Sequence, residues 1–180
     1  MNLVTATLIA GFLLLSVGAL LLSYPAPIRK GLLAFPRSKG ASLILLAVAT
    51  GLVLWQVSQL GEADFGKYKN ILFVFFLILA VGSWFKVPDF LGTRALTVLG
   101  LLLAGQFLDA AYLEQPTTRL FLVVFSYIII VLCLYLASVP YRLRDAINAL
   151  DQRLGARKIL GISLACYGAV LCLVPFTFAA

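Results

Sequence analysis

Six long apolar runs dominate the sequence, and their length restricts the structures that the chain can form. Each run is close to the ~20 residues that an α-helix needs to cross the hydrocarbon core of a bilayer. Lipid offers no hydrogen-bond partners, so a crossing segment must satisfy its backbone within itself, as a helix does. We therefore predict an all-α, polytopic membrane protein whose six transmembrane helices form one compact bundle, a single domain over residues 1–180. The spans are expected at residues 3–23, 41–60, 71–87, 95–113, 120–139 and 159–178.

The composition excludes a water-soluble globule. Apolar residues make up 63% of the chain and charged residues 12%, whereas soluble domains have about half and about a quarter. Six crossings use about 120 residues, which leaves no room for a second folded domain. The third run is short, and five spans with a re-entrant third segment is the alternative arrangement.

Lysine and arginine fall mostly on one side of this arrangement. Eleven lie after the first, third and fifth runs, and three, Lys67, Lys69 and Arg119, lie on the opposite side. Loops rich in these residues stay in the cytoplasm, so we expect both termini outside. No cation precedes the first run, as in an uncleaved helix inserted N-out. We expect the membrane to be a bacterial inner (plasma) membrane.

The basic loops account for the net charge of +7 without a nucleic-acid partner. Cations beside a span are attracted to anionic headgroups by about 1 kcal/mol each. Headgroups or a protein partner are expected at nine of them: Arg29, Lys30, Arg37, Lys39, Arg142, Arg144, Arg153, Arg157 and Lys158. Because the same charges also set the orientation, specific lipid binding is not required.

The loop between the last two spans has the pattern of an amphipathic helix over about residues 140–154. Leu143, Ile147, Leu150 and Leu154 recur at helical spacing, with charged residues between them. Such a helix is expected to lie at the cytoplasmic membrane surface with its apolar face inward. It is either an interfacial linker or a docking surface for a partner.

Small residues at intervals of four or seven indicate which spans pack closely. Small side chains let helix backbones approach each other in lipid. The expected packing positions, on the first, second, fourth and sixth spans, are Gly11, Gly18, Ala47, Gly51, Gly100, Ala104, Gly161, Ala165 and Ala169. The third and fifth spans carry bulky side chains, so we expect them to face lipid, a partner protein or a second copy of the chain.

Asp109 is the one acidic residue within a predicted span, about one turn from its outer end. An ionisable group in a span is a functional-site hypothesis by default. Gln106 lies on the same helix face, and Gln56 and Gln59 lie at the outer end of the second span, so a polar cavity could form there. The alternative is a structural ion pair between Asp109 and Arg119.

Catalytic and cofactor motifs are absent. The chain has no histidine, which excludes histidine-ligated haem, histidine-based metal sites and Ser-His-Asp hydrolysis. Its three cysteines lie in apolar runs without a C-x-x-C pair. No nucleophile elbow or phosphate-binding loop is present. We expect no enzyme activity, no metal and no cofactor.

Two functions remain as expectations. The first is an accessory or scaffold subunit of a larger membrane complex, which follows from the missing chemistry and the bulky spans. The second is a small-solute transporter or channel around Asp109. In scale the chain resembles the vitamin-uptake S-components, and Ala6-x-x-x-Ala10 is similar to the alanine-spaced contact on their first helix. The termini of S-components are usually cytoplasmic, which differs from the orientation expected here.

Overall fold

The fold is all-α, as the sequence predicts. A computed structural model describes residues 2–35, 38–61, 65–86, 90–114 and 117–177, and over these ranges it contains helices and no strand. Six helices, some with an adjoining 3-10 turn, are long and apolar enough to cross a membrane. The chain is therefore an integral membrane protein. The long helices are α1 (Leu3–Ser23), α3 (Lys39–Ser58), α4 (Lys69–Lys86), α5 (Leu91–Ala111), α6 (Leu120–Ser138) and α8 (Leu154–Leu173).

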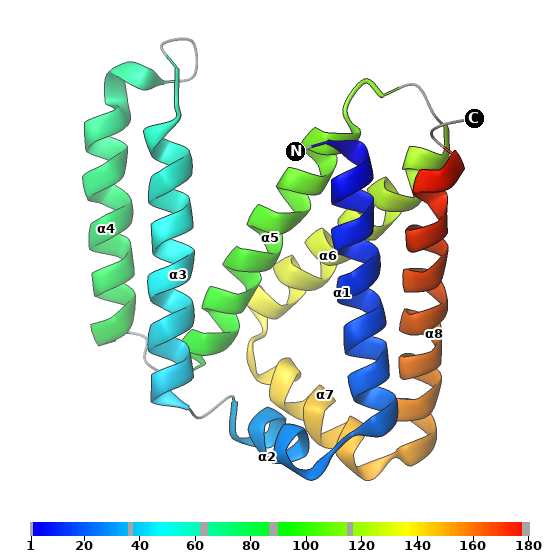
Figure 1. Ribbon diagram of the computed structural model, residues 1–180. Helices are drawn as coiled ribbons and strands as arrows, with labels where there is room; N and C mark the ends of the chain where they lie inside the picture. The colour runs from blue at the N-terminus through cyan, green and yellow to red at the C-terminus, as the bar shows by residue number, and fades with distance from the viewer. Residues whose placement is uncertain (1, 36–37, 62–64, 87–89, 115–116, 178–180) are drawn as a thin grey trace.

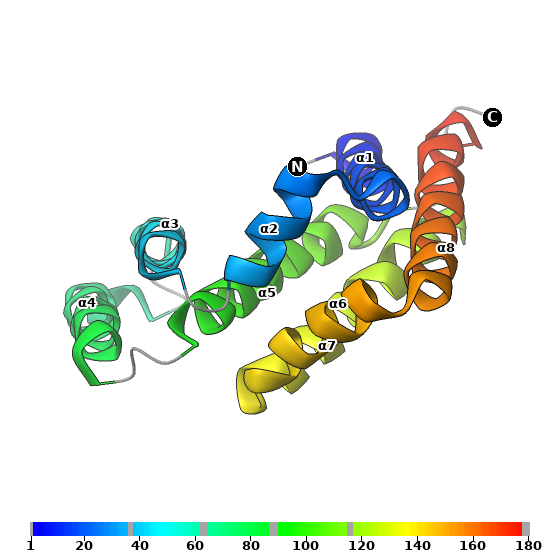
Figure 2. The ribbon, with the colours of Figure 1, turned by 90° about the horizontal axis from the view of Figure 1, so that it is seen from below.

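Two shorter helices, α2 (Ala26–Ala34) and α7 (Tyr141–Gln152), lie across one end of the long ones (Figures 1 and 2). Short 3-10 helices, η3 (Gly66–Tyr68), η4 (Thr117–Arg119) and η5 (Val174–Thr177), adjoin α4, α6 and α8 at the other end. Both termini also lie at that end (Figure 1). The five-span alternative gains no support, because η3 and α4 together are as long as the neighbouring spans.

Two helices begin about one turn earlier than their apolar runs. α5 begins at Leu91 and α8 at Leu154, whereas the sequence predicts spans from 95 and 159. The added turns contain Arg94, Arg157 and Lys158, whose long aliphatic stems allow a helix to continue while the charge stays near water. One consequence concerns Leu154, which was expected to complete the apolar face of the 140–154 helix. α7 ends at Gln152, and Leu154 belongs to α8 with 54% of its surface exposed.

The first and last long helices form the most extensive helix pair, and glycine makes it possible. A Cβ atom on Gly11 would lie 3.0 Å from the Gly168 carbonyl oxygen, and one on Gly18 would lie 2.8 Å from that of Gly161. Backbone therefore contacts backbone at two levels along α1 and α8, which is how helices associate where lipid removes the hydrophobic drive.

A second packed layer joins α5 and α6. Phe107, Ala104 and Leu122 are fully buried, and the rings of Phe107 and Phe125 lie 6.2 Å apart. The expectation that the bulky fifth span lies outside the packed centre is therefore wrong for α6. Side-chain size does not decide position in a bilayer, because the protein interior and the lipid are both apolar. Gly100 adds to this layer by facing the Cys133 sulfur of α6.

Small-residue stripes select the wrong face in two helices. Ala47 and Gly51 of α3 are exposed, and α3 instead buries Ser42 and Ala49. Ala169 of α8 is also exposed, and the contact runs through Gly161, Ala165 and Gly168. Several small stripes can occur on one helix, and the one that packs is the one that meets a complementary backbone.

The α3–α4 hairpin stands apart from the α1–α8 pair, with α5 between them (Figure 1). α4 packs mainly on α3, and none of its described residues is buried. The hairpin therefore connects to the rest of the bundle through the contact of α3 with α5.

Candidate functional site: a groove between α3 and α5

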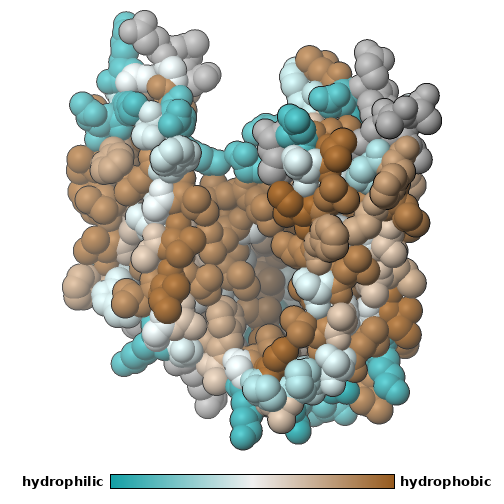
Figure 3. Space-filling view, in the orientation of Figure 1, coloured by the Kyte–Doolittle hydropathy of each residue, from teal (hydrophilic) through white to brown (hydrophobic). Residues whose placement is uncertain are grey.

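α3 and α5 meet closely at one end and diverge toward the other (Figure 1). At the close end, a Cβ on Gly92 would lie 2.8 Å from the Ser42 hydroxyl oxygen. That hydroxyl donates to the Ser38 carbonyl at 2.9 Å, which keeps the small side chain against its own helix. At the open end, near the termini, lies a groove of about 620 Å³. Figure 3 shows that the face between the hairpin and α1 is hollowed, with apolar side chains on its walls.

The groove brings together the three glutamines expected near Asp109. Gln56 and Gln59 come from α3 and Gln106 from α5. Each carboxamide carries two donors and an acceptor, and none of the three side chains has a hydrogen bond to another described residue. The remaining walls are apolar: Leu52 and Trp55 of α3, and Leu99, Leu102 and Leu103 of α5. Trp55 is 67% exposed, so the groove offers one aromatic face beside three amides.

Asp109 lies beyond this groove. It is exposed and is absent from the lining, although its spacing from Leu102 and Gln106 places it on the same face of α5. Three carboxamides therefore line the groove, and the Asp109 carboxylate lies one turn of α5 beyond Gln106.

The expected ion pair between Asp109 and Arg119 is not formed in the described part of the chain. Arg119 Nη1 instead donates to the Ala111 carbonyl at 3.3 Å and to the Glu114 carbonyl. The last carbonyls of a helix have no partner within it and carry partial negative charge. Arg119 is used to join the end of α5 to the start of α6.

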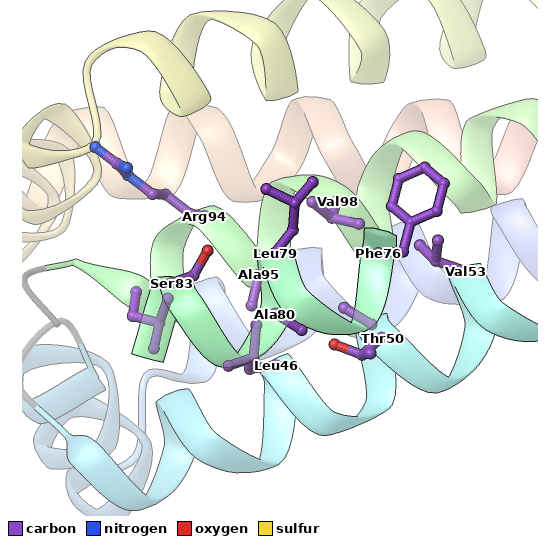
Figure 4. Close-up of a pocket in the computed structure, with 12 residues that line it drawn as sticks. Leu46, Thr50, Val53, Phe76, Leu79, Ala80, Ser83, Arg94, Ala95 and Val98 are labelled. Carbon is purple, nitrogen blue, oxygen red and sulfur yellow. The ribbon is translucent and has the colours of Figure 1, made fainter. Parts of the chain in front are cut away.

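A second pocket, of about 270 Å³, lies nearer the basic end between α3, α4 and α5. Figure 4 shows its lining, which is aliphatic and aromatic except for Thr50, Ser83 and Arg94. The sequence does not predict this pocket, because three helices build it and none of them carries a motif. Arg94 was expected in the loop before the fourth span, whereas it lies in the first turn of α5.

An ion-paired cluster joins the two short helices at the basic end. Arg29 of α2 donates to both oxygens of Asp151 of α7, at 2.6 and 2.9 Å, and the Tyr24 hydroxyl lies 3.3 Å from the same carboxylate. The Arg157 guanidinium sits 4.2 Å from the centre of the Tyr24 ring. Hydrogen bonds from Arg29 hold the pKa of Asp151 below its usual value, so the carboxylate stays charged. Burial, together with Asp151, raises the pKa of the Tyr24 phenol.

The cations expected at headgroups or a partner therefore divide into two groups. Arg29 and Arg144 are ion-paired, Arg144 with Asp145 at 3.1 Å, and Arg142 and Arg157 lie over tyrosine rings. Arg37 lies outside the described residues. The others are exposed at the basic end: Lys30, Lys39, Arg153 and Lys158.

No family model, curated protein or solved structure matches the chain. Within the described residues, no cluster of three or more histidine, cysteine, aspartate or glutamate side chains is placed to hold a metal ion. A function must therefore be argued from the groove, the hairpin and the pocket.

Proposed function

We propose that the chain is a non-catalytic subunit of a larger membrane protein complex, and that it binds its partner through the α3–α4 hairpin and the groove beside it. The supporting observation is α4, a helix of 18 residues that packs mainly on α3 and buries none of its described side chains. Membrane helices are held by packing against one another. A helix with one neighbour leaves most of its packing surface for another protein.

The groove supports the same proposal. Its walls carry leucines from two helices that diverge, so a third helix could lie between them and pack on both. Neighbouring helix axes lie about 8–10 Å apart, and the contact of Ser42 with Gly92 holds α3 and α5 that close only at one end. At the open end a partner helix would restore the packing that α3 and α5 lack there.

Orientation is part of the proposal. The eleven-to-three charge bias supports a cytoplasmic position for α2 and α7, with both termini outside, in a bacterial inner membrane. On α7, Ile147 is buried and Leu143 and Leu150 are half-buried, which supports an interfacial helix with its apolar face on the bundle. A membrane-impermeant thiol reagent tests this. An Asn2→Cys variant should be labelled on intact cells, and a Gln152→Cys variant only after permeabilisation.

Photo-crosslinking in the native membrane tests the subunit role. A photoreactive residue at Leu102 in the groove, or at Ile78 on α4, should give one crosslinked protein of defined mass. The same residue at Ile162, which is 54% exposed on α8, is the matched control and should give much less of that product. A purified chain that is monomeric in its native mass spectrum and crosslinks only to lipid at all three positions would contradict the proposal.

A second function, a small-solute transporter or channel, is favoured by one observation. Three amides line the groove, and Asp109 follows on the same face of α5. In proteoliposomes containing a pH indicator, a proton-coupled carrier should pass protons, and Asp109→Asn should abolish that flux. Unchanged flux in Asp109→Asn, with the fold intact, would exclude Asp109 from transport.

A further inference from the structure

The pocket between α3, α4 and α5 has the shape of a slot for a hydrocarbon chain. Its walls come from three helices and include Leu46, Val53, Phe76, Leu79 and Val98 (Figure 4). Ala80 and Ala95 leave the space open because their side chains are short. α4 meets α5 only weakly, so whatever occupies the slot lies between these two helices.

Two cations stand at the basic end of this slot. Arg94 contributes its stem to the lining, and its guanidinium extends away from the apolar side chains toward the α6–α7 connection (Figure 4). Lys86 ends α4 one turn after Ser83, which also lines the pocket. Neither cation has a hydrogen bond or ion pair to another described side chain. Arg29 and Arg144, at the same end of the bundle, have carboxylate partners.

We propose that this pocket binds one anionic phospholipid from the leaflet at the basic end, with an acyl chain between α3, α4 and α5 and its phosphate at Arg94 and Lys86. The ligand must be apolar along the slot and negative at the mouth. Arginine binds phosphate oxygens in a two-pronged, charge-assisted geometry. Basic pockets between transmembrane helices are a recurrent site for anionic headgroups.

Other occupants fit less well. An uncharged or zwitterionic lipid fills the slot but leaves the two cations without net neutralisation. A partner helix is better suited to the groove at the other end, whose volume is more than twice as large. The two sites use different residues of α3 and α5, so lipid binding does not depend on the subunit role. Bound lipid would brace α4 against α5 and hold the hairpin in place.

The test uses the purified chain, delipidated and returned to mixed micelles with phosphatidylglycerol or phosphatidylcholine bearing a photoreactive acyl chain. Mass spectrometry should find phosphatidylglycerol attached to peptides of α3 and α4, in clear excess over phosphatidylcholine. Arg94→Gln should lower that labelling about fivefold, the effect of one cation near an anionic group. Lys67→Gln removes one positive charge at the opposite end of the hairpin, in η3, and should leave the labelling unchanged.

A second pair of variants tests the slot itself. Ala80→Leu should fill it and reduce labelling of these peptides by both lipids, whereas Ala137→Leu, at an exposed position of α6, should not. Thermal unfolding of each variant separates lost binding from lost fold. Equal labelling by the two lipids, or equal labelling of the Arg94→Gln and Lys67→Gln variants, would overturn the proposal. So would a pocket crosslinker in native membranes that captures a protein helix in place of lipid.

Discussion

Replacing Gly18 with alanine should push α1 away from α8. The added Cβ would lie 2.8 Å from the Gly161 carbonyl oxygen and 2.9 Å from the Ala165 amide nitrogen, whereas ordinary contact begins at 3.4 Å. Both neighbours are backbone atoms of a helix, so no side-chain rotation relieves the clash. The helices must separate by roughly half an ångström, and the cost is that of overpacking a close-packed interface.

The magnitude follows from two opposing effects. Overpacking costs about 1–3 kcal/mol, and replacing glycine by alanine inside a helix returns up to about 1 kcal/mol. Gly105 of α5 supplies the control, because a Cβ there meets nothing within 4 Å. Gly105→Ala should gain only the helix-propensity effect. Gly18→Ala should therefore be about 1–3 kcal/mol less stable than Gly105→Ala, since the propensity effect cancels between them.

Unfolding in mixed micelles of mild detergent and dodecyl sulfate, followed by circular dichroism, measures this difference. Equal stability of the two alanine variants would refute the backbone-to-backbone contact of α1 with α8. Gly168→Ala, whose Cβ would lie 2.9 Å from the Gly11 carbonyl oxygen, adds a consistency check. Once the helices are separated by the first alanine, the second costs less, so the double variant should be less destabilised than the sum of the two.

Three further outcomes are expected from single contacts. Phe107→Ala should cost about 3–5 kcal/mol in the same unfolding assay, since it opens a cavity against Phe125. Phe12→Ala, at an exposed position of α1, should cost little, and equal losses would count against the α5–α6 core. Arg119→Gln should lower the free energy of unfolding by about 1 kcal/mol, because the hydrogen bonds to the Ala111 and Glu114 carbonyls are lost. Asp109→Asn should leave it unchanged, and a loss of stability in that variant would indicate a structural role for the Asp109 carboxylate. The ion pair between Arg29 of α2 and Asp151 of α7 should persist at neutral pH and weaken as acid protonates Asp151. Folding lowers the pKa of Asp151. The stabilisation from this pair is therefore fully present above the unfolded pKa of about 3.9, and it disappears as the pH falls through the lower pKa of the folded state. Spin-label distances between α2 and α7, followed during an acid titration, measure this weakening. An unchanged distance down to pH 2 would contradict the prediction.

The number and rough position of the long helices follow from the sequence because lipid imposes a length and a composition on any segment that crosses it. The predicted bounds of the first span, 3–23, are those of α1. Helix ends that carry cations are harder to predict. Arg94 directly precedes the predicted fourth span, yet its flexible stem allows α5 to begin before it, at Leu91.

Which face of a helix packs was not predictable in the same way. The exposed pair Ala47 and Gly51 and the buried pair Ser42 and Ala49 are both small-residue pairs of α3. The two pairs differ in their burial because only the second faces a complementary position on α5, where Ser42 packs against Gly92. The hydrogen-bond partners of side chains are equally hard to predict from the sequence. Arg119 is an available cation for Asp109 along the sequence, but only the fold brings the carbonyls of Ala111 and Glu114 to it. The slot beside Arg94 needs three helices and has no signature in any one of them.

The pairing of α1 with α8 has a consequence for how the protein is made. α1 is synthesised before α8, and these two helices form the most extensive helix pair. At the usual rate of translation, α1 must remain in the membrane without that partner for on the order of ten seconds. During this time its glycines face lipid, which cannot supply the backbone contact that α8 later provides. A chain truncated before Leu154 would keep α1 without the helix whose backbone contacts Gly11 and Gly18.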